Sequence, residues 1–293
     1  MPHADAVSSL ITPDQLAARL ARPESPLRLF DVTVHLQPAP GEPVPYRVAS
    51  ARADFEAAHI PGAAFIDQQA QLSDPAAPLA FTRLPPDRLA TAFGAAGLGD
   101  GEDCVLYSST SPMWATRAWW LLRSIGVPAR VLDGGLAGWR SGARAVASGP
   151  GATWPTAGLT ALEQPRLWAT REEVLAAIDD GAVCTINALP AAVHDGSAGA
   201  GYHGRRGHIA GSVNLPYPAL LQPDGTLQPD EVLRDHAAGS GALQRPRAIC
   251  YCGGGIAATL TALVLLRLGH RDVAVYDGSL AEWAADPSLP MSV

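Results

Sequence analysis

The segment VLDGGLAGW at residues 131–139 recurs as VYDGSLAEW at residues 275–283, 144 residues further along the chain. Just upstream, VLYSS begins at Val105 and its counterpart ICYCG begins at Ile249, again 144 residues later. Two matched blocks at one offset indicate that the chain contains the same structural unit twice. This repeat decides the fold, because whatever each block forms in the first half, its copy is expected to form in the second.

A third matched pair lies earlier in each half: HIPGAAFI at residues 59–66 and HIAGSVNL at residues 208–215. The offset is 149 residues here, so a loop between the blocks differs in length by five residues (149 against 144). Between the halves, residues 146–165 are rich in Gly, Pro, Ala and Thr, a composition typical of a linker. We therefore expect one domain at residues 1–145 and a second at residues 166–293.

Each half alternates short strands with helices. In the second half, AVCTIN (182–187) and RAICY (247–251) are short apolar runs, as expected for strands buried on both faces. Residues 256–270 have the length and composition of a helix, and residues 272–278 return as a strand. The first half repeats this order. The sequence predicts an α/β fold with two tandem domains, each a mainly parallel sheet flanked by helices.

The composition excludes several classes of function. The chain has 293 residues and a formal net charge of −7, whereas nucleic-acid or anionic-membrane surfaces need a clustered basic excess. All 21 Lys+Arg residues are arginine. Because the chain has no lysine, it can form no Schiff base and has no phosphate-loop lysine. We expect no nucleic-acid partner.

The sequence also bears on the compartment. The N-terminal stretch lacks a basic flank followed by a long apolar run, so no secretory signal is predicted. No run of apolar residues is long enough to predict a membrane span. Four cysteines in a chain of this length do not suggest a disulfide framework, and Cys104 and Cys184 lie in apolar runs typical of buried thiols. We expect a reduced, cytoplasmic protein.

A cysteine stands at the junction of a predicted strand and a predicted helix. Cys252 is followed by three glycines, which let the backbone fold tightly and turn several N–H groups toward one point. The positive end of the following helix adds to this field, which favours a thiolate over a thiol. The first repeat has Ser108 at the matching position. This difference indicates one catalytic domain and one scaffolding domain.

The HIPGA block, the Tyr-Cys-Gly loop and the LDGG-x-x-x-W block, with the cysteine only in the second copy, resemble tandem-domain rhodaneses and mercaptopyruvate sulfurtransferases. The resemblance covers nearly the whole chain. It implies that Cys252 is a nucleophile that carries sulfur as a persulfide, and that the backbone of the following loop binds the substrate. The loop residues concerned are Gly253, Gly254, Gly255, Ile256 and Ala257.

The same resemblance implies a small anionic sulfur donor, 3-mercaptopyruvate or thiosulfate. It also implies an acceptor that is cyanide or a thiol, such as thioredoxin or another thiol protein. No metal and no organic cofactor are implied.

The loop departs from the pattern of this family in ways that concern the donor. Thiosulfate-using members tend to carry Arg and Lys in the loop, where this chain has Gly253 and Gly254. Mercaptopyruvate-using members have a Cys-Gly-Ser-Gly-Val-Thr loop, which this loop resembles more closely. Gly254 and Ala257 nevertheless replace the serine and the threonine, so both loop hydroxyls are missing. The loop favours the mercaptopyruvate type without establishing it.

Substrate-binding residues outside the loop are less well defined. The family's Asp-Ala-Arg segment and the arginine that follows it are replaced here by Asn-Ala-Leu at residues 187–189. Arg205 and Arg206 remain as candidates to bind a carboxylate or sulfonate, since guanidinium groups suit planar oxyanions. His59 is a candidate to donate a proton to a leaving enolate, whereas His208 is expected to be structural.

Two other functions stay open at this point. Phosphatases related to this fold need Cys-x5-Arg, and the sixth residue after Cys252 is Ala258, which argues against phosphatase activity. A non-catalytic persulfide carrier or interaction module, loaded by a partner protein, is the second alternative, because the loop hydroxyls and substrate arginines are missing. Asp133 and Asp277 are expected as turn formers or helix caps, and Cys250 as a buried strand cysteine.

Overall fold

The computed structural model describes residues 9–22, 27–199 and 201–293. Its first sheet has the order β1-β7-β6-β2-β5 and its second the order β11-β9-β12-β13-β8, with every neighbouring pair parallel. The strands of the first sheet are β1 (Leu10–Ile11), β2 (Leu27–Asp31), β5 (Ala64–Phe65), β6 (Asp103–Tyr107) and β7 (Arg130–Leu132). The strands of the second are β8 (Trp168–Ala169), β9 (Val183–Asn187), β11 (Val213–Asn214), β12 (Arg247–Tyr251) and β13 (Val273–Tyr276).

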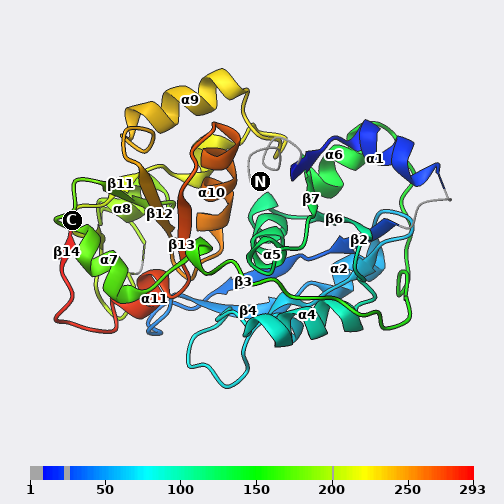
Figure 1. Cartoon of the computed structure of the whole chain (residues 1–293), viewed down its shortest axis with the longest axis horizontal. Coiled ribbons are helices and arrows are strands. Elements are labelled where there is room, and N and C mark those ends of the chain that lie inside the picture. Colours follow the sequence, from blue (N-terminus) through cyan, green and yellow to red (C-terminus); the bar gives the residue numbers. More distant parts are fainter. Residues whose placement is uncertain (1–8, 23–26, 200) are drawn as a thin grey trace.

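Helices flank both sheets, and α5 and α10 lie side by side between them (Figure 1). The helices of the first half are α1 (Pro13–Leu20), α2 (Arg52–Ala57), α3 (Gln68–Gln71), α4 (Pro86–Ala95), α5 (Pro112–Ser124) and α6 (Gly135–Ser141). Those of the second half are α7 (Arg171–Ala177), α8 (Ala191–His194), α9 (Asp230–Gly239), α10 (Ala257–Arg267) and α11 (Ser279–Trp283). Among the described residues, no helix combines the length and apolar content that crossing a bilayer requires.

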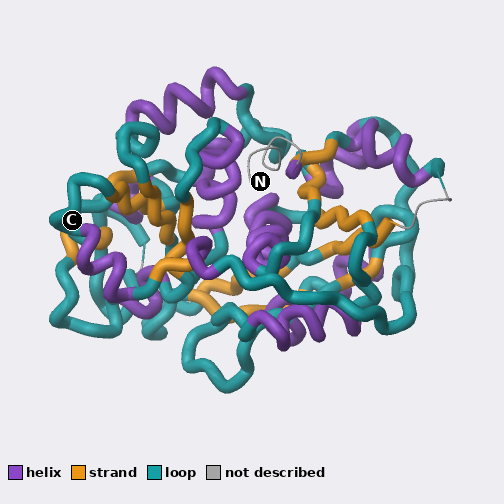
Figure 2. Tube along the Cα trace, in the orientation of Figure 1, coloured by secondary structure: helices purple, strands orange, loops and turns teal. Residues whose placement is uncertain are grey.

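The predicted α/β fold is confirmed, including its mainly parallel sheets. Strand β12 and helix α10 form where the sequence predicts them, and both are buried along most of their length. Two short antiparallel pairs add to the parallel sheets: β3 (Val34–Pro38) with β4 (Tyr46–Ser50), and β10 (His208–Ile209) with β14 (Met291–Ser292). Figure 2 shows loop connecting the two halves where the sequence predicts a linker.

The repeated blocks meet in space, which explains why they recur together. The hydroxyl of Tyr107 accepts the amide of Ile60 at 3.2 Å, and the hydroxyl of Tyr251 accepts the amide of Ile209 at 3.0 Å. Each tyrosine ends the central strand of its sheet, and each isoleucine belongs to the HI-x-G block of the same half. One buried tyrosine therefore ties the HI-x-G block to the block that contains the central strand in both copies.

The two halves share a continuous apolar contact. On the facing helices α5 and α10, the hydroxyls of Thr116 and Thr259 lie 2.8 Å apart. Trp120 meets Trp168 edge to face at a centroid distance of 6.4 Å, and Trp114 shares a cluster with Ile256. Trp114 and Trp120 therefore lie in the buried contact between the two halves.

The β3–β4 hairpin extends from the first half across to the second (Figure 1). At its distal end, Pro43 accepts the backbone amide of His203 at 2.6 Å. Tyr46, the first residue of β4, packs with Val44 against the core cluster of the second half. The first half therefore contributes side chains to the surroundings of the second sheet.

Candidate active site

Cys252 lies at the carboxyl end of the central strand β12, just before helix α10. Its side chain is 2% exposed. The turn between strand and helix requires glycine at 255, where φ is +73° and a Cβ would lie 2.7 Å from the carbonyl oxygen of Asp277. The glycine run thus lets the chain turn tightly against β13 and places the thiol at the start of α10.

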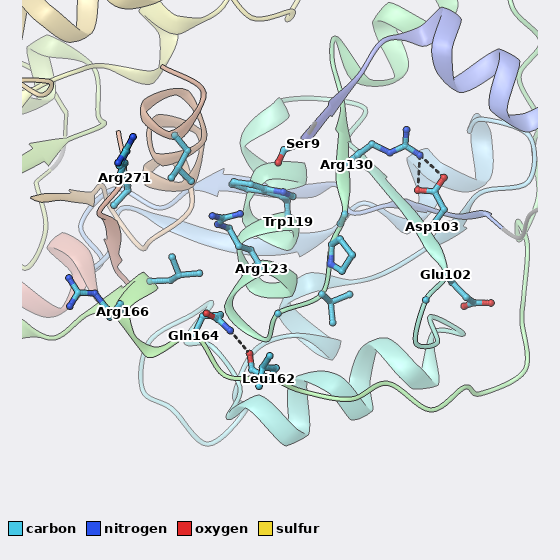
Figure 3. A pocket seen from close by; sticks show the side chains of 18 of the residues that line it. Ser9, Glu102, Asp103, Trp119, Arg123, Arg130, Leu162, Gln164, Arg166 and Arg271 are labelled. Carbon is cyan, nitrogen blue, oxygen red and sulfur yellow. Dashed lines mark hydrogen bonds and ion pairs between the residues drawn. The ribbon is translucent and has the colours of Figure 1, made fainter. Parts of the chain in front are cut away.

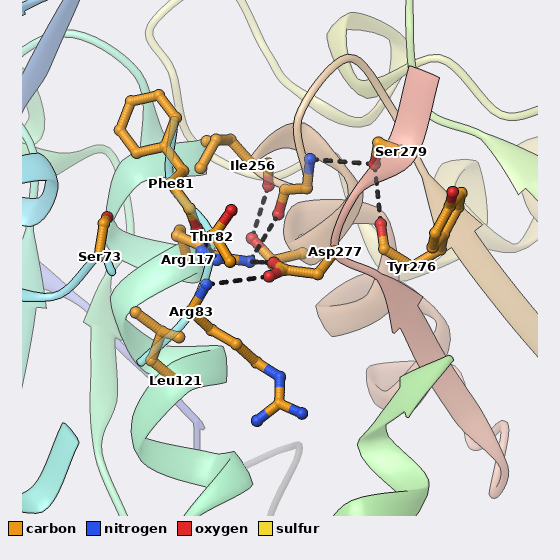
Figure 4. Close-up of polar contacts among 12 residues, drawn as sticks. Ser73, Phe81, Thr82, Arg83, Arg117, Leu121, Ile256, Tyr276, Asp277 and Ser279 are labelled. Carbon is orange, nitrogen blue, oxygen red and sulfur yellow. Dashed lines mark hydrogen bonds and ion pairs between the residues drawn. The ribbon is translucent and has the colours of Figure 1, made fainter. Parts of the chain in front are cut away.

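The hydroxyl of Ser279 holds this turn through hydrogen bonds (Figure 4). Its hydroxyl accepts the amides of Cys252 at 3.1 Å and Gly255 at 3.0 Å, and donates to the carbonyl of Tyr276 at 2.8 Å. Ser279 has φ +50°, a conformation that side-chain-bearing residues rarely adopt, and the first repeat has Gly135 at φ +53° in its place. The backbone of the second repeat is therefore strained at Ser279, and this residue supplies a hydroxyl that binds amides of the cysteine turn.

An arginine from the first half also holds the turn. Arg117 of α5 is 2% exposed, and its guanidinium lies 2.7 Å from the carboxylate of Asp277. It donates to the carbonyl of Gly255 at 3.2 Å and to that of Phe81 at 2.7 Å (Figure 4). The other oxygen of Asp277 accepts the amide of Arg83 at 3.0 Å. Asp277, expected as a turn former, instead joins the two halves beside the cysteine.

Several amides of the turn have no acceptor in the described part of the chain. These are the amides of Gly253, Gly254, Ile256 and Ala257. Helix α10 also has no side-chain cap at its N-terminus, where the first amides of a helix lack intrahelical partners. Because these N–H groups belong to one turn at the positive end of a helix, they can bind an anion beside Cys252.

The first half shows the same turn with a hydroxyl in place of the thiol. Ser108 is buried, and its side-chain oxygen accepts the amides of Thr110 at 3.2 Å and Ser111 at 3.4 Å. Amides that follow the strand therefore do converge on the side chain at this repeat position. A serine hydroxyl there satisfies these two amides within the protein.

Three tyrosines lie close enough to Cys252 for a charge on its sulfur to act on them. Burial raises the pKa of Tyr46, Tyr202 and Tyr217, and a negative charge on Cys252 raises each pKa further. A Cβ on Gly253 would overlap the hydroxyl of Tyr202, and a Cβ on Gly254 would lie 2.6 Å from the hydroxyl of Tyr46. The space beside the loop glycines is therefore filled by phenols.

The structure gives Arg205 a backbone role. Its guanidinium donates to the carbonyls of Asp286 at 2.8 Å and Leu289 at 2.7 Å. Arg206 is exposed, and no contact of its guanidinium with the Cys252 turn is found among the described residues. The arginine pair is therefore not gathered around the thiol in this structure.

His59 lies in the interior of the first half. It is 2% exposed, its Nδ1 pairs with the carbonyl of Phe55 at 2.8 Å, and its ring stacks on that of Phe55. His208 forms the matching contact, with Nδ1 2.8 Å from the carbonyl of His194. The structural role expected for His208 is confirmed. The described contacts of His59 are of the same kind, and none reaches the Cys252 turn.

Sequence reasoning missed five residues near the cysteine turn: Tyr46, Arg117, Tyr202, Tyr217 and Ser279. The repeat carried a signal for one of them, because the blocks differ as GG and GS at the position of Ser279. The run of glycines carried another, since a tight turn without side chains leaves space that other segments must fill. Nothing near Tyr46 or Arg117 in the sequence indicates their role.

A cavity of about 880 Å³ lies elsewhere, at the C-terminal ends of α5 and α10 (Figure 3). Trp119 and Arg123 line it from α5, and Leu266 and Arg271 line it from α10 and the turn that follows. Helix α10 has 11 residues, so it separates this cavity from Cys252 by roughly 16 Å. Cys252 is not among the lining residues, so this space is distinct from the cysteine turn.

Known proteins agree with this architecture. The model of the rhodanese-like domain matches twice, at residues 12–142 and 170–286. The 3-mercaptopyruvate sulfurtransferase of Escherichia coli is 33% identical over 235 residues, covering 80% of this chain and 83% of that protein. The rat 3-mercaptopyruvate sulfurtransferase is 32% identical over 280 residues, covering 91% and 88%.

A solved structure shows the same likeness. The crystal structure of SseA from Escherichia coli, a 3-mercaptopyruvate sulfotransferase, superposes with a TM-score of 0.78 at 30% identity. The match covers 92% of this chain and 98% of that one. With two domain matches and relatives of this similarity along most of its length, the chain belongs to the rhodanese family and is a sulfurtransferase with two rhodanese-like domains in tandem.

Proposed function

We propose that this sulfurtransferase moves sulfur from a small anionic donor to an acceptor through a persulfide on Cys252. The observation that carries the proposal is that Cys252 directly precedes a turn, leading into α10, whose amides have no acceptor in the described protein. Such donors stabilise a thiolate and the terminal sulfur anion of a persulfide.

The reaction divides into two displacements. In the first, the Cys252 thiolate attacks the outer sulfur of the donor, and the bond joining that sulfur to the rest of the donor breaks. Its electron pair leaves with the remainder, as pyruvate enolate from 3-mercaptopyruvate or as sulfite from thiosulfate. In the second, cyanide or an acceptor thiolate attacks the outer sulfur of the persulfide, and Cys252 leaves as a thiolate.

The described contacts favour 3-mercaptopyruvate over thiosulfate. A doubly charged donor needs cations near the thiol, but Gly253 and Gly254 supply none and Arg205 is bound to backbone carbonyls. The relatives from Escherichia coli and rat are named for 3-mercaptopyruvate. We assign the amide turn from Gly253 to Ala257 to substrate binding. Oxyanion binding by Arg206 and proton donation by His59 stay predictions, which substitution of each residue can test.

The two domains have different roles in this proposal. Residues 1–145 form a non-catalytic domain whose Ser108 satisfies its own turn, residues 146–165 are the linker, and residues 166–293 form the catalytic domain. The first domain acts on the second through Arg117, which holds the carbonyl of Gly255. The acceptor is cyanide or a thiol, with thioredoxin as a candidate protein acceptor, and the compartment is the cytoplasm.

Mass spectrometry of the intact protein tests the persulfide. After incubation with 3-mercaptopyruvate or thiosulfate and removal of excess donor, we expect a gain of about 32 Da on Cys252, the mass of one sulfur atom in the covalent intermediate. Cys252→Ser should abolish the gain and the turnover. The matched control Cys250→Ser should keep most of both, because Cys250 is buried in β12.

Two outcomes would contradict this assignment. Equal loss of activity in Cys252→Ser and Cys250→Ser would mean that the nucleophile has been misidentified. A mass gain that appears only with a desulfurase present, and with neither small donor, would show that the protein is a persulfide carrier.

A further inference from the structure

Two loop glycines are needed because phenols occupy their side-chain space. A Cβ on Gly253 would overlap the hydroxyl of Tyr202, and one on Gly254 would lie 2.6 Å from the hydroxyl of Tyr46. The backbone itself does not demand glycine at either position, since neither has a positive φ. The phenolic oxygens therefore stand where the first side-chain atoms after Cys252 would otherwise be.

Tyr46 is held in place by a contact between the two halves, and Tyr202 by contacts within the second half. Tyr46 begins β4 at the far end of the hairpin, where Pro43 accepts the amide of His203 at 2.6 Å. Tyr202 exchanges backbone hydrogen bonds with Arg205 at 2.9 and 2.8 Å, and the guanidinium of Arg205 is anchored on two further carbonyls. Rigid placement of this kind is what a proton donor in a reaction needs.

The hydroxyls differ from those of the structural tyrosines. Tyr107 and Tyr251 each accept a backbone amide, whereas no hydrogen-bond partner of the Tyr46 or Tyr202 hydroxyl is found within the described residues. Burial raises the pKa of both Tyr46 and Tyr202; a negative charge on Cys252 adds to this for Tyr46, and charges on Tyr46 and then Cys252 add to it for Tyr202. Both phenols therefore stay protonated at neutral pH, and each retains an O–H to donate.

We propose that Tyr46 and Tyr202 are catalytic residues, with Tyr46 as the proton donor to the leaving enolate and Tyr202 as a hydrogen-bond donor to the bound substrate. The proposal rests on the persulfide chemistry proposed above and adds to it the source of the proton. Tyr46 is only half-buried, so solvent can return its proton, whereas Tyr202 is 7% exposed.

Cys252 sulfur bonds to the donor sulfur, the C–S bond of 3-mercaptopyruvate breaks, and its electron pair enters the enolate. The O–H proton of Tyr46 moves to the methylene carbon, giving pyruvate and a phenolate that water reprotonates. Thiosulfate requires no such proton, because sulfite leaves as a stable anion.

This difference between donors provides the first test. We expect Tyr46→Phe to lower kcat with 3-mercaptopyruvate by about 100-fold, within the range of general acid catalysis, and to lower kcat with thiosulfate less than about threefold. Tyr202→Phe should raise KM more than it lowers kcat. Tyr276→Phe is the matched control, since Tyr276 is another buried phenol whose pKa is raised by burial and by Glu282 rather than by Cys252.

The second test replaces the hydroxyl of Tyr46 with a serine hydroxyl at position 254. Gly254→Ser should be impaired, because its side chain meets the Tyr46 hydroxyl, whereas Gly254→Ser combined with Tyr46→Phe removes the clashing oxygen and places a new hydroxyl beside Cys252. We expect the double variant to exceed both single variants in kcat with 3-mercaptopyruvate. Thermal unfolding of each variant shows whether the change lies in the fold or in the chemistry.

The outcomes separate this inference from the proposed function. If the wild-type protein gains no sulfur on Cys252 from either small donor, the persulfide chemistry fails first. If it does gain sulfur, equal losses with both donors in Tyr46→Phe, or a double variant no better than Gly254→Ser, overturn the role of Tyr46. An unchanged KM in Tyr202→Phe overturns the role of Tyr202.

Discussion

Asp277, at the end of β13, accepts the backbone amide of Arg83 from the other half of the chain at 3.0 Å. The repeat makes this contact reciprocal, because Asp133 in the first half accepts the amide of Leu227 in the second at 2.9 Å. Each repeated Asp-Gly block therefore ties its own domain to a loop of the other one. Of these two aspartates, Asp277 is the one linked to the cysteine turn, because Arg117 contacts both Asp277 and the carbonyl of Gly255.

Arg117→Met should destabilise the protein and impair catalysis together. The substitution leaves the carboxylate of Asp277 without its partner in a largely buried position, a change that typically costs about 3–5 kcal/mol. The carbonyl of Gly255 also loses its donor, so the cysteine turn loosens. Urea unfolding and kcat/KM measure the two effects.

The reciprocal contact supplies the control. Asp133→Asn keeps an acceptor for Leu227 and lies away from Cys252, so it should cost about 1 kcal/mol or less and leave kcat/KM unchanged. An Arg117→Met variant as stable and active as Asp133→Asn would show that the buried ion pair does not support the turn.

Ser279→Gly should show what the Ser279 hydroxyl contributes to the cysteine turn, because the variant removes that hydroxyl alone. Glycine adopts φ +50° without strain, so the backbone is preserved while the acceptor for the amides of Cys252 and Gly255 is lost. Two buried amides without a partner cost about 1–3 kcal/mol each, and part of this is returned by relief of strain. We expect kcat/KM to fall by about tenfold or more, measured beside unfolding in urea; wild-type kinetics would disprove the positioning role.

The four thiols should differ sharply in reactivity. Burial raises the pKa of Cys104, Cys184 and Cys250, and so keeps them protonated at neutral pH. Iodoacetamide at pH 7.5, followed by peptide mapping, should modify Cys252 first. Since Cys252 is 2% exposed beneath the phenols, Tyr46→Ala should speed its alkylation without exposing Cys250. Modification of Cys104 or Cys250 before Cys252 would contradict this order.

The pH dependence of stability should contain a contribution from His194. Burial, and then the neighbouring His208, lower the pKa of His194 from 6.5 to about 4. Between these pH values the unfolded chain binds a proton at His194 that the folded chain does not bind. The free energy of unfolding therefore falls as pH falls through 6.5 toward 4. We expect a loss of about 1–3 kcal/mol between pH 7 and pH 4.5, allowing for partial solvent exposure.

His194→Gln tests this contribution, because glutamine does not titrate. Urea unfolding at pH 7 and at pH 4.5 gives the unfolding free energy of both proteins. The wild type should lose more of this free energy than the variant between pH 7 and pH 4.5, and the extra loss should be most of the contribution expected from His194. His236→Gln, on α9, is the control for replacing a histidine elsewhere in the same half of the chain. Parallel curves for wild type and His194→Gln would mean that His194 titrates normally in the folded protein.

The fold and the nucleophile followed from local patterns and from the repeat. Short apolar runs, a glycine-rich turn and matched blocks are properties of neighbouring residues, so they predict β12, α10 and the placement of Cys252 between them. The comparison of Cys252 with Ser108 also separated the two domains without any coordinates. Arg205 and His59 show the limit of this reasoning, because residue type indicated an oxyanion or proton site while the structure places both against backbone carbonyls.

The sequence alone therefore determined a duplicated α/β chain with one thiol at the end of a central strand. Only the tertiary structure decided what surrounds that thiol, since glycines leave space and distant segments fill it. Tyr46 lies on a hairpin of the first half and Arg117 lies on a helix of the first half. Tyr202 lies on a loop of the second half that Arg205 holds in place. Packing of the two halves, which no local pattern encodes, brings these groups within reach of Cys252.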